Sequence, residues 1–300
     1  MFKKDLLSSQ RILVTGGGTG LGRAMAEKFL ELGADVAICG RRGEVLLRTA
    51  KELDQKYRRK VATYTLDIRQ PPAVEKMVED LFANGGLTGL VNNAAGNFIS
   101  RTEDLSHRGF DAIANIVMHG TFYVTHSIGK RWIEQVKSQG GWKPGMPMKS
   151  VMSIIVTWVR NGSPFVVPSA MSKSAIHTMT MSLATEWGRY GIRLNAVGPG
   201  EIPTEGAAKR LRPREEPGAR SARDNPQGRA GQMSELQNLA AFLMSDGCNW
   251  LSGQSIMLDG AGHLATGGNF YELRNWQDAD WQQARAAIEE QNMKDRAQRG

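Results

Sequence analysis

The chain has 300 residues, of which 41% are hydrophobic and 23% are charged, so it has enough apolar material for a globular core. No run of 18 apolar residues occurs, and we therefore predict no membrane span and no membrane partner. The formal net charge is +8. Because basic residues are interleaved with acidic ones and no basic-aromatic strip occurs, this charge favours a polyphosphate ligand over nucleic acid.

Two further features bear on the compartment. About ten residues precede the first predicted strand, too few for a cleavable leader ahead of the fold. The two cysteines, Cys39 and Cys248, provide neither a disulfide framework nor a metal-binding spacing. We interpret them as buried or unreactive thiols in a reducing compartment, and we predict that the protein is cytoplasmic.

Short apolar runs alternate with helical segments along most of the chain. Amphipathic spacing predicts helices over Leu21–Leu32 and Ser169–Tyr190, each followed by a glycine. Strands are predicted at Arg11–Thr15, Asp35–Cys39, Ala62–Leu66, Leu87–Val91, Val151–Thr157, Ile192–Val197 and Ser255–Leu258. This alternation is typical of the α/β class, and we predict a single doubly wound Rossmann fold with a seven-stranded parallel sheet.

The alternation is interrupted toward the end of the chain. Residues 200–232 are rich in Pro, Gly, Arg and Glu, and we interpret them as a mobile substrate loop within a nucleotide-binding domain spanning 1–262. Residues 263–300 are predicted to form a C-terminal extension with a helix over Trp276–Arg296. A further loop is expected at Ser138–Lys149.

A glycine-rich turn, TGGGTGLG at Thr15–Gly22, follows the first strand and opens the first helix. Glycines allow the backbone to approach a pyrophosphate, and the helix N-terminus offers free N–H donors. The missing Lys-Ser/Thr pair disfavours a P-loop nucleotidase, although a purely structural turn is the alternative. The predicted cofactor-binding residues here are Thr15, Gly16, Gly18, Thr19, Gly20 and Leu21.

The second strand runs into Cys39-Gly40-Arg41-Arg42. A carboxylate at this point is typical of NAD sites, because it binds the ribose hydroxyls. Guanidinium groups at Arg41 and Arg42 instead suit the 2′-phosphate of NADPH by charge and by bidentate geometry. The alternative is a solvated helix start. We predict NADPH/NADP⁺ as the cofactor.

These motifs, with Asn92–Gly96 (NNAAG) and Asn195–Gly200 (NAVGPG), make the chain resemble the short-chain dehydrogenases/reductases over nearly its full length. The resemblance implies that Asp67 and Ile68 meet the adenine. It also implies that the stretch after the fourth strand lines the ribose side of the cofactor. The remaining cofactor residues implied in this way are Asn93, Ala94, Ala95, Lys173, Pro199, Gly200 and Ile202.

Within that family the chain is most similar to 2,4-dienoyl-CoA reductases of the mitochondrial type. The similar stretches include NNAAGNFIS (92–100), GTFYVTHSIGK (120–130), GSPFVVPSAMSK (162–173), PTEGAAKRL (203–211), QNLAAFLMSD (237–246) and GGNFYELR (267–274). The resemblance implies NADPH-dependent reduction of a conjugated acyl-CoA thioester in fatty acid β-oxidation, and a homotetramer. The residues implied to line the substrate are Asn97, Phe98, Pro164 and Phe165.

The catalytic positions depart from the family pattern. The usual Tyr-x-x-x-Lys pair is Ser169 and Lys173 here, one helical turn apart. The resemblance puts the acting Tyr of dienoyl reductases at Trp158, and their helix Asn at His119. An indole N–H donates but does not ionise near neutral pH, whereas histidine can donate or act as an acid. We therefore expect Lys173, Ser169, Trp158 and His119 to form the catalytic group, with Trp158 and His119 as donors to an enolate oxygen.

Three of these residues also have a purely structural alternative. Ser169 could be a helix N-cap, Lys173 a lysine on a helix surface, and His119 a structural histidine. Three functions remain open. They are the acyl-thioester reductase, a reductase of another carbonyl or imine substrate, and a catalytically quiet NADPH-binding protein. A basic group in the 200–232 loop could hold coenzyme A phosphates, with a solvated charge run as the alternative. Its members are Lys209, Arg210, Arg212 and Arg214.

Overall fold

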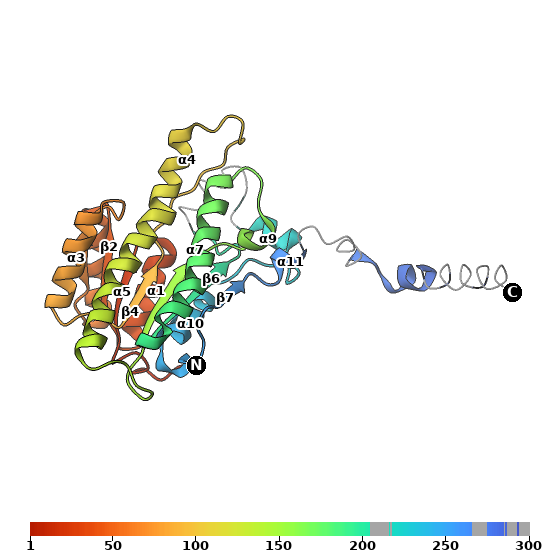
Figure 1. Ribbon diagram of the computed structural model, residues 1–300. Helices are drawn as coiled ribbons and strands as arrows, with labels where there is room; N and C mark the ends of the chain where they lie inside the picture. The colour runs from red at the N-terminus through yellow and green to blue at the C-terminus, as the bar shows by residue number, and fades with distance from the viewer. Residues whose placement is uncertain (205–215, 217, 266–274, 285, 287–292, 294–300) are drawn as a thin grey trace. The chain divides into compact units, whose positions relative to one another are not determined.

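The computed structural model of the chain describes residues 1–204, 216, 218–265, 275–284, 286 and 293. The chain divides into two compact units, Met1–His263 and Leu264–Gly300. The first unit holds the sheet with its flanking helices (Figure 1). None of the described helices is long and apolar enough to cross a membrane.

Seven strands form one all-parallel sheet in the order β3-β2-β1-β4-β5-β6-β7, which confirms the predicted doubly wound fold. The order reverses between β1 and β4, where parallel doubly wound folds place their ligands. The strands are β1 (Arg11–Thr15), β2 (Asp35–Gly40), β3 (Ala62–Thr65), β4 (Gly89–Asn92), β5 (Lys149–Ile154), β6 (Ile192–Pro199) and β7 (Ser255–Leu258).

Helices cover both faces of the sheet. One core cluster joins the sheet to α1 (Gly20–Glu31), α2 (Gly43–Tyr57) and α10 (Met233–Met244). The other joins it to α3 (Pro71–Ala83), α5 (Gly120–Ser138) and α7 (Val167–Trp187). Side chains of β1 alternate between the clusters, as the period of a strand requires. Ile12 and Val14 enter the first cluster, and Leu13 enters the second.

Among the described residues up to 265, the remaining helices are short. They are α4 (His107–Ala114), a π-helical turn η1 (Asn115–His119), α6 (Trp158–Asn161), a 3₁₀ turn η2 (Gly188–Tyr190), α9 (Ala219–Asp224), a 3₁₀ turn η3 (Asp246–Cys248) and α11 (Gly262–Ala265). Together α4, η1 and α5 make one continuous helical run along the second face (Figure 1). The two cysteines are buried free thiols, and burial raises the pKa of Cys39 to about 12.

Several boundaries differ from the sequence-based expectation. The fifth strand spans Lys149–Ile154 rather than Val151–Thr157, and Trp158 begins a separate helical turn. Helix α9 lies within the stretch 200–232 that we predicted as an irregular loop. In the C-terminal unit, residues 278–284 are helical, inside the predicted helix Trp276–Arg296. Beyond residue 284 of that predicted helix only 286 and 293 are described, and residues 205–215 of the loop also lie outside the described residues.

Candidate active site

The glycine turn brings backbone from two strand ends into close contact. Gly16 and Gly20 have φ values of 65° and 55°, which favour glycine. A Cβ on Gly22 would lie 2.5 Å from the carbonyl oxygen of Gly16 and would also overlap Nδ2 of Asn93. The turn therefore presents bare backbone at the N-terminus of α1.

Thr15 ties this turn to the end of β4. Its hydroxyl oxygen accepts hydrogen bonds from the backbone N–H groups of Asn93 and Ala94, both at 3.0 Å. Nδ2 of Asn93 in turn donates to the carbonyl oxygens of Thr15 (2.9 Å) and Gly16 (3.2 Å). The structure thus brings together two predicted cofactor segments that lie nearly 80 residues apart, because β1 and β4 are neighbours at the switch point.

The N-terminus of α1 suits a phosphate. Thr19 stands at the N-cap with an extended backbone, its side chain makes no capping bond, and the first turn contains no acidic residue. The free N–H groups and the positive end of the helix dipole are therefore available to an anion. At the neighbouring end of β2, the side chains of Arg41 and Arg42 are exposed, and neither forms an ion pair with any residue the structure describes.

Asp67 follows β3 and already has a partner that the sequence did not suggest. The guanidinium of Arg69 forms an ion pair with its carboxylate and donates to Oδ2 from Nε (2.9 Å) and from Nη2 (2.5 Å). Hydrogen bonds from Arg69, aided by the charge of Arg41, lower the pKa of Asp67 despite partial burial. Asp67 is thus an ionised acceptor near the predicted adenine position. The adjacent Ile68 is buried and packs against Gly120.

Ser169 and Lys173 lie on the first turns of α7, and both side chains are buried. Nζ of Lys173 donates to the carbonyl oxygen of Ile154 at the end of β5. Burial lowers the pKa of Lys173 to about 8. Ser169 is not the N-cap, since Val166 holds that position. Its hydroxyl makes no hydrogen bond to another described residue.

His119 closes the π-helical turn η1. Its side chain is exposed, and its Nδ1 lies 2.8 Å from Oδ1 of Asn115. The same Asn115 accepts, at its backbone oxygen, the π-type hydrogen bond from the N–H of Gly120. This helical segment packs against α7, the helix that carries Ser169 and Lys173. Sequence reasoning missed Asn115, although its spacing of four residues from His119 was a usable signal.

The predicted substrate residues lie on two loops that meet. The backbone N–H of Ser100 donates to the carbonyl oxygen of Phe165 at 2.9 Å. This bond joins the loop holding Asn97 and Phe98 to the loop holding Pro164 and Phe165. Phe165 is 57% exposed and has a φ of 64°, a conformation that a residue with a side chain rarely adopts. Trp158, half-buried, begins the helical turn α6 just before the second loop.

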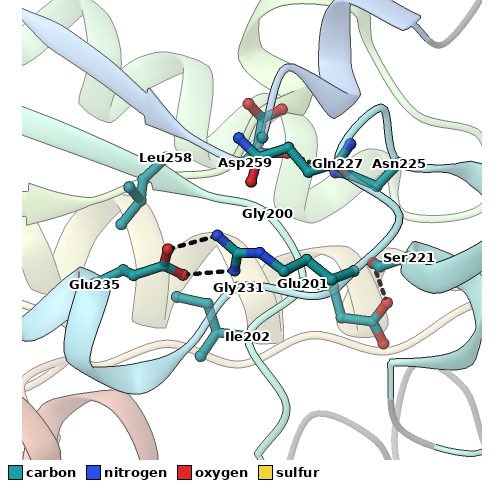
Figure 2. A pocket seen from close by; sticks show the side chains of 12 residues that line it. Gly200, Glu201, Ile202, Ser221, Asn225, Gln227, Gly231, Glu235, Leu258 and Asp259 are labelled. Atoms are coloured by element: carbon teal, nitrogen blue, oxygen red, sulfur yellow. Dashed lines mark hydrogen bonds and ion pairs between the residues drawn. The ribbon is translucent and has the colours of Figure 1, made fainter.

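A pocket lies at the carboxyl ends of β6 and β7, where predicted cofactor residues Gly200 and Ile202 form part of its lining (Figure 2). The chain after β6 is held there by Glu201. Its carboxylate accepts hydrogen bonds from the hydroxyl of Ser221 (2.5 Å) and the N–H of Gly218 (3.1 Å). Arg229 and Glu235, which also line the pocket, form a bidentate ion pair (Figure 2).

Pro199, the other predicted cofactor residue of this region, is the last residue of β6. The basic group Lys209, Arg210, Arg212 and Arg214 falls outside the described residues. Among the residues that the structure does describe, no cluster of histidine, cysteine, aspartate or glutamate could hold a metal ion.

The fold and this site define a dinucleotide-binding oxidoreductase. Residues 16–263 match the family model described as enoyl-(acyl carrier protein) reductase, and the chain belongs to the short-chain dehydrogenase/reductase family. It is 41% identical over 294 residues to a probable 2,4-dienoyl-CoA reductase of Caenorhabditis elegans, covering 95% of this chain and 91% of that protein.

Other comparisons agree with this assignment. The chain is 38% identical over 256 residues to a probable 2,4-dienoyl-CoA reductase of Bacillus subtilis, covering 85% of this chain and 96% of the relative. A crystal structure of a short chain dehydrogenase from Bacillus anthracis matches with a TM-score of 0.74 and 35% identity. That match covers 85% of this chain and 97% of the other. The predicted family is therefore confirmed, and the protein is a nicotinamide-dependent oxidoreductase.

Proposed function

We propose that the protein is an NADPH-dependent reductase of conjugated acyl-CoA thioesters, of the 2,4-dienoyl-CoA reductase type. The relatives with that name at 38–41% identity support the substrate class. The observation that carries the proposal is the make-up of the site. Lys173 lies buried beside polar side chains, but no tyrosine stands at position 158 or 169.

That make-up distinguishes two kinds of reduction. An alkoxide formed from a ketone needs a proton from a strong donor such as a tyrosine hydroxyl, which is missing at both positions. A conjugated thioester instead gives a delocalised enolate, whose oxygen needs hydrogen-bond donors. Trp158 supplies an indole N–H, and His119 supplies an imidazole on the helical run against α7. The site therefore suits conjugate reduction better than ketone reduction.

The cofactor-binding residues have matching roles. When bound, the reduced nicotinamide supplies the hydride. The backbone of Gly16–Leu21 would bind the pyrophosphate, and Asp67 would accept from the adenine amino group beside Ile68. Asn93, Ala94 and Ala95 would line the ribose side, and Pro199, Gly200 and Ile202 would line the nicotinamide side. Lys173 and Ser169 would bind the nicotinamide ribose or orient the thioester. Asn97, Phe98, Pro164 and Phe165 would contact the acyl chain.

NADPH is preferred over NADH in this proposal because Arg41 and Arg42 are exposed cations beside the glycine turn. In Arg41→Ala, loss of charge-assisted hydrogen bonds should weaken NADPH binding about 10- to 100-fold and leave NADH binding unchanged. Fluorescence titration measures both constants. The control Arg131→Ala removes an exposed arginine of α5 and should change neither. Equal losses for both nucleotides in Arg41→Ala would contradict the preference.

The activity is tested by following NADPH oxidation with a 2,4-dienoyl-CoA, a 2-enoyl-CoA and a simple ketone in parallel. We expect turnover with the dienoyl thioester and little with the ketone. The reverse result would identify a carbonyl reductase. Cofactor binding without turnover of any of the three substrates would identify a catalytically inactive NADPH-binding protein.

We further propose that the protein is a cytoplasmic homotetramer. Phe122 on α5 and Met171 and Met181 on α7 are between 41% and 56% exposed, which supports association through these two helices. Light scattering after size exclusion should give four times the mass of the chain, and Phe122→Glu should lower it. Because a relative from Danio rerio is named peroxisomal, the compartment is tested by imaging the tagged full-length chain.

A further inference from the structure

The π-helical turn η1 carries two polar side chains, and their contact has a chemical consequence. Oδ1 of Asn115 is a carbonyl oxygen, which can only accept a hydrogen bond. Nδ1 of His119 lies 2.8 Å from this oxygen, and we therefore assign the hydrogen of the neutral ring to Nδ1. In the neutral imidazole, Nε2 then holds a lone pair and no proton. Only the imidazolium form of His119 can donate from Nε2.

We propose that Asn115 is a positioning residue that keeps the proton of neutral His119 on Nδ1, so that His119 delivers a proton from Nε2 only as the imidazolium. This inference rests on the proposed reduction of a conjugated thioester. In that reaction the hydride forms a new C–H bond on the diene, and the displaced electron pair moves to the thioester oxygen as an enolate. The Nε2–H bond then breaks, its proton goes to the enolate, and neutral His119 remains.

The backbone of the turn supports this role. The N–H of Gly120 bonds the carbonyl oxygen of Asn115, five residues back, so the turn is wider than an α-helical turn. Asn115 is therefore bonded twice at the end of this turn, through its backbone oxygen to Gly120 and through its side chain to His119. A Cβ on Gly120 would lie 2.7 Å from Cγ1 of Ile68, so the end of the turn packs closely against a residue that we expect at the adenine. Isolated π-turns of this kind are frequent at functional sites.

The turn η1 continues directly into α4 and α5 in one helical run, and α7 packs against it. Tyr123 of α5 places its ring centroid 6.2 Å from that of His119, and Lys173 of α7 is directed at Ile154. On α4 the titratable and charged side chains are His107, Arg108 and Asp111. In the described part of the chain, no carboxylate forms an ion pair with His119.

Two variants separate positioning from simple structural support. Asn115→Asp keeps an acceptor at Nδ1 and adds a negative charge that stabilises the imidazolium. We expect the alkaline fall of kcat/KM for dienoyl-CoA to move to higher pH by about one unit or more. Asn115→Leu removes the acceptor, and we expect kcat to fall about 10-fold or more while the Kd for NADPH stays unchanged. An unmoved alkaline limb in Asn115→Asp would overturn the proposal.

A measurement without turnover keeps the inference separate from the proposed function. Nitrogen-15 NMR shifts of the imidazole distinguish the two tautomers, and His119→Gln identifies the signal. In the NADPH complex, at a pH where the ring is neutral, we expect the proton of His119 on Nδ1 in the wild type. In Asn115→Leu we expect that proton to be distributed between Nδ1 and Nε2. His126, which makes no hydrogen bond to a described residue, is the internal control. A neutral His119 protonated on Nε2 would overturn the inference, whether or not any thioester is reduced.

Discussion

Gly22 packs against Asn93 so closely that a single added carbon would overlap the amide Nδ2. That amide bonds two carbonyl oxygens of the glycine turn, so the contact couples the N-terminus of α1 to the end of β4. The approach requires glycine at position 22, on the helix itself, and not only at the turn positions with positive φ.

Gly22→Ala should therefore destabilise the protein by about 2 kcal/mol or more, because backbone or Asn93 must shift. We also expect the NADPH Kd to rise at least about 10-fold, since the anion-binding backbone moves. Urea unfolding and fluorescence titration measure the two effects. Gly188→Ala is the matched control, because a Cβ there meets nothing within 4 Å. Equal behaviour of the two variants would contradict the packing argument.

Lys173 should make stability depend on pH in the absence of cofactor. Its pKa is lowered to about 8 in the folded protein from 10.5, so the unfolded chain binds more protons between these values. The free energy of unfolding should therefore rise as pH increases from about 8 to 10.5. At pH 7, Lys173→Met should be more stable by up to about 3 kcal/mol, while losing activity.

Urea unfolding of both proteins at pH 7 and pH 10 checks this prediction. Lys149, whose pKa burial also lowers, is present in both proteins and cancels in the comparison. Parallel stability profiles for wild type and Lys173→Met would show that burial of the ammonium costs nothing.

Trp158 offers a test of donor strength. Trp158→Phe removes the indole N–H, and we expect kcat for dienoyl-CoA to fall about 10- to 100-fold with the NADPH Kd unchanged. Trp158→Tyr places a phenol where the dienoyl reductases that the chain resembles have one, and should retain or raise kcat. Steady-state kinetics distinguish these outcomes. If Trp158→Phe and the wild type have the same kcat, the indole N–H has no role in the reaction.

Phe165 combines an exposed ring with a φ of 64°, and its two properties can be separated. Phe165→Gly should relieve about 1 kcal/mol of backbone strain and so raise the unfolding free energy, while raising KM for the acyl substrate. Phe165→Ala keeps the strained backbone and loses the ring, so only KM should rise. Thermal unfolding and steady-state kinetics report the two effects. A stability gain in both variants would assign the strain to the ring rather than to the backbone.

Most of the fold could be predicted from alternating apolar runs and helical spacing, because burial on both faces of a parallel sheet leaves strong patterns. Strand ends were less predictable. Ile155 is as apolar as Ile154, the last residue of β5, yet it lies past the end of that strand in another buried cluster. Helix α9 escaped prediction because charged and small residues dominate it, so no apolar stripe marked it.

Some features of the candidate site could likewise be predicted from the sequence, and others could not. The glycine turn and the Ser169/Lys173 pair were predictable because their chemistry depends on local spacing. The ion pair between Arg69 and Asp67 and the positive φ of Phe165 could not be predicted. Side-chain pairing and backbone conformation depend on the three-dimensional surroundings. The π-turn at Asn115–His119 belongs to this second group, since its extra residue leaves no compositional mark.

The hydrogen bond between Ser100 and Phe165 couples the movements of the two loops, although these residues are 65 positions apart in the sequence. A substitution that displaces one loop will pull on the other. Attempts to widen the enzyme for bulkier acyl groups should therefore vary both loops in a single library. Substitutions in one loop alone would strain the hydrogen bond between Ser100 and Phe165 before they enlarged the space for the acyl group.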